Sequence, residues 1–588
     1  MSSRVKAKAS RAAAVPKGAR SKTLRSVDTN VSAYDRTDPF TALNTLLRLL
    51  VSLPTRLGGC QYRLSPDEHA LSLHLLSIVE PFVGVAESQR SFTRQPTELL
   101  DAIVGHVDSR QDLLALALSC KRMHAIVFPR HFEYRVIRGK VSSLRLWNHL
   151  IVNRSLARNI RVLEVLDERA AAQEVLPSGI STTDTDLEST DDELGLHVKH
   201  ERFLVSALTR MTTLRSFTWS CNHSPISMEQ VWPALLKCRT LSHIEINDNL
   251  LFAPGNEGNN SQDQSKKSIV LPELRTVSLK STKHTYGATK TPSLTRLSTM
   301  LNNCPNLEDL TVGYAQRRSG DYLSPVADDL LLCGRWPYLR SLTLTNLWCP
   351  PQTGLDVTMS FLAAHANLQV LHLDLSLGAA AAAGPLVLPA DALPRLRELR
   401  SNRDFASAVL HCPCSADGGR PLEILKGMKL SGSGWDDRFL AGLKKTGASM
   451  KRIELAGWND VEDVRRLVSC VPKLVWLDVG KRANSAPAAA SSAPANLVEW
   501  LTVLSPLAEL TTFHGVRLFY EVSATDPTSA VSLSERSRLR KNEEIASTLV
   551  WKCAKLRRVD HWEEGSGKVV VLVRDGEKAK YEVRRVKA

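Results

Sequence analysis

The chain has 588 residues, is 43% hydrophobic and carries a formal net charge of +15 at pH 7. That length allows several domains or one long repeat array. No stretch reaches the ~18 uninterrupted apolar residues of a membrane helix, and no N-terminal segment has the apolar core of a secretory signal. These features argue against an exported protein and against a helical membrane protein.

The positive charge is concentrated at the N-terminus. Residues 1–27 carry eight Lys or Arg and no acid, which leaves +7 for the rest of the chain. Since large apolar residues are almost absent, 1–37 is predicted to be a disordered basic tail. A solvated tail, a nuclear address, a nucleic-acid arm and a transit peptide all remain open for it. The modest charge elsewhere does not indicate nucleic-acid binding.

Residues 38–92 are predicted to form a helical leader. Two stretches, 39–57 and 66–85, show apolar residues at helical spacing. The stripes are Leu43, Leu46, Leu47 and Leu50 in the first stretch, and Leu71, Leu75, Ile78 and Val79 in the second.

Residues 93–140 contain the most informative pattern. Pro96 is favoured at the first helical position, and the apolar residues that follow it form one helical face. Ser109 followed by Asp112 predicts an N-cap that begins a second helix. That second helix is apolar nearly all round, so it must be buried on two sides. A unit this small cannot bury both sides alone, and one face is therefore expected to bind a partner.

This segment resembles an F-box. The family pattern is roughly Pro-x-Glu-Leu-Leu, Ile three residues later, Asp-Leu-Leu and Leu-x-Cys-Lys-Arg, which matches the stretch from Pro96 to Arg122. Gln95 and Met123 depart from it, since the family usually has Leu before the Pro and often Trp after the Arg. The resemblance implies docking on the Skp adaptor of cullin–RING ubiquitin ligases. The residues that it assigns to adaptor binding are Pro96, Leu99, Leu100, Ile103, Leu113, Leu114, Leu116, Leu118, Cys120 and Met123.

From 144 to 565 a repeat with the core L-x-x-L-x-L recurs about a dozen times. Examples are NLEDLTV from Asn306, YLRSLTL from Tyr338 and NLQVLHL from Asn367. Each L-x-L predicts a short strand with its leucines on one side, and helical stretches lie between copies. One repeat cannot bury its leucines alone, so the copies must stack. The expected fold class is α/β: an N-terminal helical F-box followed by a curved leucine-rich-repeat solenoid, with parallel strands on the concave side and helices on the convex side.

Three loop insertions and a terminal hairpin interrupt or end the array. The insertions are predicted near 167–200, which is acidic, near 254–268, which is rich in Asn, Gln, Gly and Ser, and near 481–496, which is rich in Ala, Pro and Ser. Residues 566–588 have two strand-like runs around Asp575-Gly576. They predict a β-hairpin that caps the last repeat.

The whole arrangement, over about 96–565, resembles F-box proteins with C-terminal leucine-rich repeats. That resemblance implies that the helical segment binds the adaptor while the solenoid binds a protein substrate for ubiquitination. Residues between the strand leucines face the concave surface, which is polar, carries both charge signs and suits a protein partner better than nucleic acid. The candidate substrate face consists of Ser341, Thr343, His372, Asp374, Arg400, Arg452, Glu454, Trp476 and Asp478.

The sequence does not indicate that this chain catalyses a reaction. The sequence has no nucleotide-binding, serine-hydrolase or zinc-protease motif, so we expect no catalytic residue, cofactor or metal. Eleven scattered cysteines fit buried free thiols in a reducing compartment, the cytoplasm and/or nucleus. The function expected is a substrate-recognition adaptor of an SCF-type E3 ubiquitin ligase. A non-catalytic repeat scaffold whose F-box-like helices act only as a cap, and a nucleic-acid-associated protein that uses the basic tail, remain as alternatives.

Overall fold

The computed structural model describes most of the chain, in two compact units, Met1–Leu100 and Asp101–Ala588. The described residues are 27–52, 64–83, 92, 95–180, 193–220, 228–254, 270–284, 288–315, 323–351, 353–377, 386–414, 419–432, 434, 436–483, 494–522, 532–563, 565–575 and 578–586. Within these ranges no helix is long and apolar enough to cross a membrane.

The first unit contains a pair of packed helices, α1 (Pro39–Ser52) and α2 (Pro66–Val83), preceded by the short turn η1 (Val31–Ala33). Its core consists of Ala42, Leu49, Leu71, Leu75, Ile78 and Val79. Val31 and Tyr34 pack against this core, so the folded leader begins before the predicted end of the basic tail at 37. Residues 1–26 of that tail lie outside the described residues.

The predicted apolar stripe of α1 is rotated in the structure. Leu47 and Leu50 are exposed, whereas Ala42 and Leu49 are buried against α2. The periodicity identified a helix, but with apolar residues around most of its circumference it could not identify the face that α2 covers.

Three helices follow: α3 (Thr97–Gly105), which crosses from the first unit into the second, α4 (Arg110–Ser119) and α5 (Lys121–Val127), continued by the π-helical turn η4 (Phe128–Phe132). The Ser109 side chain accepts a hydrogen bond from the Asp112 backbone N–H at 3.3 Å, which confirms the predicted cap of α4. The Cys120 thiol caps α5 in the same way, because it accepts from the Met123 N–H at 3.4 Å.

In the second unit the described strands form one sheet whose neighbours are parallel from β1 to β15. Each predicted repeat copy contains one of these strands. The strands are β1 (Val136–Lys140), β2 (Val162–Leu166), β3 (Ser216–Ser220), β4 (His243–Asn247), β5 (Thr276–Lys280), β6 (Asp309–Gly313), β7 (Ser341–Cys349), β8 (Val370–Leu377), β9 (Glu398–Arg400), β10 (Ile424–Lys429), β11 (Arg452–Trp458), β12 (Trp476–Asp478), β13 (Lys481–Arg482), β14 (Thr512–His514), β15 (Arg558–Asp560), β16 (Lys568–Asp575) and β17 (Lys578–Arg585).

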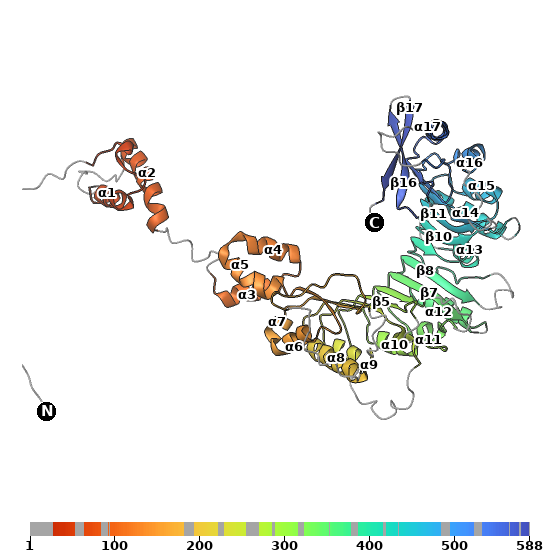
Figure 1. Cartoon of the computed structure of the whole chain (residues 1–588), viewed down its shortest axis with the longest axis horizontal. Helices are drawn as coiled ribbons and strands as arrows, with labels where there is room; N and C mark the ends of the chain where they lie inside the picture. The colour runs from red at the N-terminus through yellow and green to blue at the C-terminus, as the bar shows by residue number, and fades with distance from the viewer. Residues whose placement is uncertain are drawn as a thin grey trace, which may run out of the picture. The chain divides into compact units, whose positions relative to one another are not determined.

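Helices line the outer side of this curved array and strands line its inner side (Figure 1). The helices are α6 (Leu144–Val152), α7 (Arg154–Ala157), α8 (Glu193–Leu208), α9 (Met228–Leu235), α10 (Thr295–Leu301), α11 (Asp328–Cys333), α12 (Gly354–Ala364), α13 (Arg403–His411), α14 (Asp437–Thr446), α15 (Val461–Cys470), α16 (Leu497–Leu504) and α17 (Leu533–Lys552), with short turns η5 (Asn249–Phe252) and η7 (Gly447–Ser449).

The core is a continuous stack of strand leucines. Leu310, Leu342, Leu371 and Leu399 occupy the same register position on four neighbouring strands, and all are buried. Residues between them alternate to the inner surface, as the burial pattern of each strand shows. The described residues therefore form a curved α/β repeat solenoid.

The solenoid begins earlier than predicted and its first insertion is shorter. β1 at Val136–Lys140 pairs with β2, so the sheet starts inside the segment assigned to the F-box. Within the insertion predicted near 167–200, Val175 pairs with Arg138 and α8 begins at Glu193. The insertions predicted near 254–268 and 481–496 fall largely outside the described residues.

The last two strands form an antiparallel hairpin at the end of the parallel sheet. β16 pairs antiparallel with β15, and β17 pairs antiparallel with β16 over eight residue pairs. The buried side chains of Val570 and Leu572 extend the leucine stack beyond the last parallel repeat.

Candidate functional site

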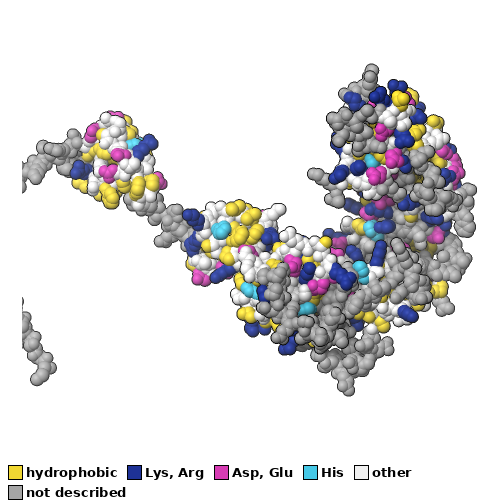
Figure 2. Space-filling model, in the orientation of Figure 1, with side chains coloured by type: hydrophobic (Ala, Val, Ile, Leu, Met, Phe, Trp, Pro, Cys, Tyr) yellow, Lys and Arg dark blue, Asp and Glu magenta, His cyan; other side chains and the backbone are white. Residues whose placement is uncertain are grey.

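An apolar surface lies on α3 and α4. Ile103 of α3 and Leu114 and Leu118 of α4 are 45%, 39% and 73% exposed, and these three residues are called the helical patch below. Leu99, one turn before Ile103 in α3, is also exposed. Hydrophobic side chains gather on the visible face over α3–α5 (Figure 2). Leu114 and Leu118 are four residues apart and therefore share one helical face.

The other residues that the F-box resemblance assigns to adaptor binding have different environments. Leu100, Leu113 and Met123 are buried, so their side chains are not presented to solvent. Leu116 and Cys120 are half-buried, and Pro96 is exposed. Cys120 has the additional local role of capping α5.

The C-terminus of α3 is held by arginines of the first repeats. Arg135, which is fully buried, donates to the Val104 carbonyl at 3.1 Å, and Arg161 donates to the Gly105 carbonyl at 2.7 Å. The last carbonyls of a helix lack internal partners and attract cations, so both bonds satisfy the helix end. Burial and the nearby Arg161 charge lower the pKa of Arg135 to about 10, and it stays a cation at neutral pH.

An acid completes this junction. Asp108, just after α3, lies 3.3 Å from the Arg161 Nε and 2.6 Å from an Arg215 guanidinium nitrogen. Arg135, Arg161 and Arg215 each directly precede a strand, β1, β2 and β3 respectively. We call these three arginines and Asp108 the anchor cluster. Sequence reasoning missed it, although an arginine before the strand in successive copies was a signal that could have found it.

A buried histidine supports the same helices. His131 Nε2 lies 2.9 Å from an Asp101 carboxylate oxygen in α3. Burial lowers the pKa of His131. The hydrogen bond between His131 and the Asp101 carboxylate raises it, but by less than burial lowers it. His131 is therefore neutral at pH 7, and its hydrogen bond to Asp101 links η4 to α3.

The predicted substrate-face residues fall into register rows on the inner surface. Thr343, His372 and Arg400 are direct neighbours on β7, β8 and β9, and Glu454 and Asp478 continue the row on β11 and β12. Arg452 and Trp476 are paired in the adjacent row, at whose other end lies Ser341. Asp374 lies two residues after His372 on β8. It pairs with Thr345 of β7 and is exposed.

Some charges of the inner face are paired with one another, as in Arg452 with Glu454. Glu398, another residue of the inner surface, lies 2.9 Å from His372 Nε2 and 2.7 Å from Lys426 Nζ. Burial raises the pKa of Glu398, but the bonds from Lys426 and His372 outweigh burial and the net pKa is lowered. A carboxylate held in this way orients two neighbouring strands' side chains.

Trp476 is already in contact with its neighbours. The Arg452 guanidinium lies 4.2 Å from the Trp476 ring centroid, and the His514 ring lies 5.2 Å from it. The Asp478 carboxylate, two residues after Trp476 in β12, accepts a hydrogen bond from the Gly480 N–H at 2.9 Å. Burial raises the pKa of Asp478, and the Asp560 and Glu454 carboxylates add to that rise. This part of the inner surface thus combines the Trp476 ring with the carboxylates of Asp478, Asp560 and Glu454.

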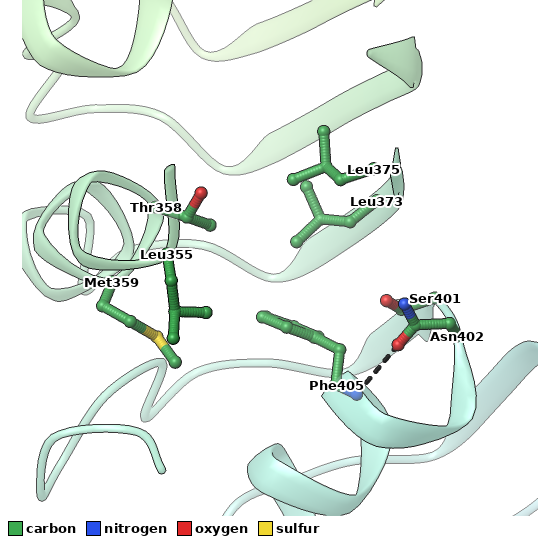
Figure 3. A pocket seen from close by; sticks show the side chains of 8 residues that line it. All are labelled: Leu355, Thr358, Met359, Leu373, Leu375, Ser401, Asn402 and Phe405. Atoms are coloured by element: carbon green, nitrogen blue, oxygen red, sulfur yellow. Dashed lines mark hydrogen bonds between the residues drawn. The ribbon is translucent and has the colours of Figure 1, made fainter. Parts of the chain in front are cut away.

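A small apolar pocket lies where α12, β8 and the start of α13 meet (Figure 3). Its volume of about 10 Å³ is what one water molecule needs. Asn402 at its edge accepts a hydrogen bond from the Phe405 N–H at 2.9 Å and so caps α13. The pocket is too small for an organic ligand, and no group of His, Cys, Asp and Glu among the described residues could hold a metal ion.

Comparisons with known proteins find similarity among solved structures but none at the level of sequence. No family model matches the sequence, and no curated protein matches it either. The structure is similar to a chain in the crystal structure of the Rad7 and Elc1 complex in yeast, with a TM-score of 0.31 and 13% sequence identity. The match covers 75% of this chain and 92% of that chain.

Proposed function

We propose that this protein is the substrate-recognition subunit of an SCF-type E3 ubiquitin ligase. In this proposal the F-box-like helices bind the Skp adaptor, and through it the cullin–RING ligase, while the inner face of the solenoid binds a protein to be ubiquitinated. The observation that carries the proposal is the helical patch, which presents Ile103, Leu114 and Leu118 to solvent.

Two physical arguments support this assignment. Clustered exposed aliphatic side chains are characteristic of protein-binding surfaces, since their burial contributes about 25 cal/mol per Å². The anchor cluster also fixes the end of α3 to the first repeats through buried arginine bonds. A fixed junction is useful to a receptor that must hold a target lysine near an activated ubiquitin, because proximity is the chain's only contribution to the reaction.

The proposal includes no catalytic residue, metal or cofactor in this chain. It assigns the protein to the cytoplasm or nucleus, where thiols stay reduced. Burial raises the pKa of Cys238 to about 11 and that of Cys304 to about 12, which suits unreactive core thiols.

A second candidate is a non-catalytic repeat scaffold in which the F-box-like helices act only as a cap. The anchor cluster favours this reading too, because it joins α3 to the first three strands. The two candidates differ in what they require of the helical patch: the receptor needs it as a contact surface, whereas the cap does not.

Adaptor co-purification tests the proposal. The full-length protein is co-expressed with a Skp adaptor, and wild type is compared with the double variant Ile103→Asp, Leu114→Asp. Both side chains are exposed, so the charges should leave the thermal unfolding temperature nearly unchanged. We expect adaptor recovery to fall at least tenfold, because two carboxylates would be buried in the interface.

The matched control is Leu332→Asp, Val498→Asp, which charges two aliphatic residues on outer helices of the solenoid that are more exposed than Ile103 and Leu114. It should retain the adaptor fully. Retention of the adaptor by the Ile103, Leu114 variant, or absence of any adaptor with wild type, would exclude the receptor function and favour the scaffold.

A further inference from the structure

The two ends of the sheet differ in how their edges are covered. At the β1 end, Arg138 and Val175 exchange two backbone hydrogen bonds of 3.0 and 2.8 Å, and the Lys140 N–H donates to the Glu174 carboxylate. The chain thus covers its own first edge. At the other end, β17 exchanges backbone hydrogen bonds with β16 alone among the described residues.

The register shows which backbone groups point to the open edge. The Val586 N–H donates to the Gly567 carbonyl on the β16 side at 2.8 Å. In an antiparallel ladder this orientation alternates, so Glu582 and Arg584 also face β16. The N–H and C=O groups of Val583 and Arg585 therefore point away from the sheet.

The open half of β17 is accessible. Val583 is 40% exposed and Val586 is 56% exposed, and Glu582, Arg584 and Arg585 are exposed as well. The first half of the strand is fixed, since Ala579 is buried and the Tyr581 ring lies 5.5 Å from Phe519. An added strand would therefore pair with a strand whose first half is held by the core.

The edge is basic. β17 contains Lys578, Lys580, Arg584 and Arg585 against the single acid Glu582. Arg584 pairs with Glu582 at 2.7 Å, whereas Arg585 makes no ion pair with any described residue. A partner strand with acidic side chains would therefore be attracted, because opposite charges on facing strand positions are favourable.

The same charges disfavour a second copy of this chain. Each copy would bring four cations and the single acid Glu582 to the pair, so two β17 strands side by side repel through their net positive charge, although pairing about Val583 would set Glu582 opposite Arg584. Basic side chains on an edge strand also reject neutral strands and so limit aggregation.

We propose that the open edge of β17 is a second docking surface, which takes an extended acidic segment of a partner protein as an added strand. The affinity comes from main-chain bonds to Val583 and Arg585, and the selectivity comes from the basic side chains. This site is separate from the helical patch and from the inner face, and it does not depend on the ubiquitin-ligase assignment.

Peptide binding by the full-length protein tests this site. The probe is a fluorescein-labelled eight-residue peptide of alternating Glu and Val, as long as β17, and fluorescence anisotropy reports binding. We expect saturable binding that weakens with salt, and none by a Lys and Val peptide of the same length. Val583→Pro should weaken binding roughly fivefold or more, because it removes an outward N–H that the fold does not use.

Charge reversal and a matched control complete the experiment. Arg584→Glu, Arg585→Glu should abolish binding, whereas Lys237→Glu, Arg239→Glu, which reverses two exposed cations near α9, should leave it intact. Equal binding by wild type and Val583→Pro would overturn strand addition. Equal binding of the basic peptide, no binding of either peptide, or a dimer that Val583→Pro dissolves would overturn the acidic partner.

Discussion

At the scale of single residues, Asp248 is a buried carboxylate whose charged form destabilises the folded state. It is buried at the end of β4, where it accepts hydrogen bonds from the Leu250 N–H at 2.9 Å and from Trp219 Nε1 at 3.2 Å. Burial raises the pKa of Asp248 to about 7, because these two bonds only partly compensate the lost hydration.

This shifted pKa gives a stability prediction with a definite sign. The folded-state pKa lies above the unfolded value of 3.8, so the folded protein binds the proton more tightly. Above about pH 7 the buried charged carboxylate therefore lowers the free energy of unfolding by the full amount. This penalty shrinks as the pH falls from about 7 and is gone near 4. Relative to wild type, Asp248→Asn should gain on the order of 2 kcal/mol in unfolding free energy between pH 5 and pH 8.

Urea denaturation at several pH values checks this. A difference between the Asp248→Asn variant and wild type that does not change with pH would contradict a raised pKa. The variant's constant offset, which includes one hydrogen bond lost to Trp219, does not enter the comparison because only the pH-dependent part is used.

Residue environments mark the limit of sequence prediction at this scale. Leu113 and Leu114 are adjacent and chemically identical, yet the first is buried and the second exposed. Since α4 is apolar nearly all round, its sequence contains no polar face that identifies the solvent side. The buried side is decided by α5 and η4, which pack against α4. The sequence therefore predicted a contact segment but could not separate its core residues from its surface residues.

At the scale of elements, the anchor cluster should determine how firmly α3–α5 are held. Arg161→Met removes the donor to the Gly105 carbonyl and one of the two arginine partners of Asp108. Leaving the end of α3 without its buried arginine donor costs about 1–3 kcal/mol, and the exposed Asp108 carboxylate adds little to this. Hydrogen exchange of α3, α4 and α5 should accelerate about tenfold, while exchange of β5–β9 stays unchanged.

The control for Arg161→Met is Arg275→Met, because Arg275 occupies the same position before a strand in a later repeat. Arg275 directly precedes β5 and pairs with Glu308 at the surface, where an ion pair contributes little. Arg275→Met should leave all exchange rates nearly as in wild type. Equal effects of the two substitutions would show that the cluster is not a special junction.

Elements were predicted where the repeat is regular and missed where it is not. Every L-x-x-L-x-L copy contains a strand, because alternation fixes both the strand and its buried side. β1 was missed since its sequence, VIRGK, has no leucine pair and follows the helices without a break. α8 was missed because its hydrophobic residues follow an acidic stretch that dominates the local composition.

At the scale of the whole molecule, a repeat array is stabilised by contacts between neighbours, so a disturbance at one end should stay near that end. The hairpin of β16 and β17 covers the last parallel strand, and Val570 and Leu572 belong to the same core as the leucine stack. Removing residues 566–588 would expose the edge of β15 and the apolar side chains beneath it. We therefore expect the last repeats to open locally while the first repeats remain folded.

Hydrogen exchange on the truncated chain measures how far this opening extends. Protection should be largely lost in β15 and α17, reduced in β14 and unchanged in β2–β5, because each repeat contacts only its neighbours. Adaptor binding through the helical patch, at the other end of the array, should persist. A uniform loss of protection from β2 to β14 would contradict the nearest-neighbour picture and would mean that the hairpin stabilises the solenoid as one cooperative unit.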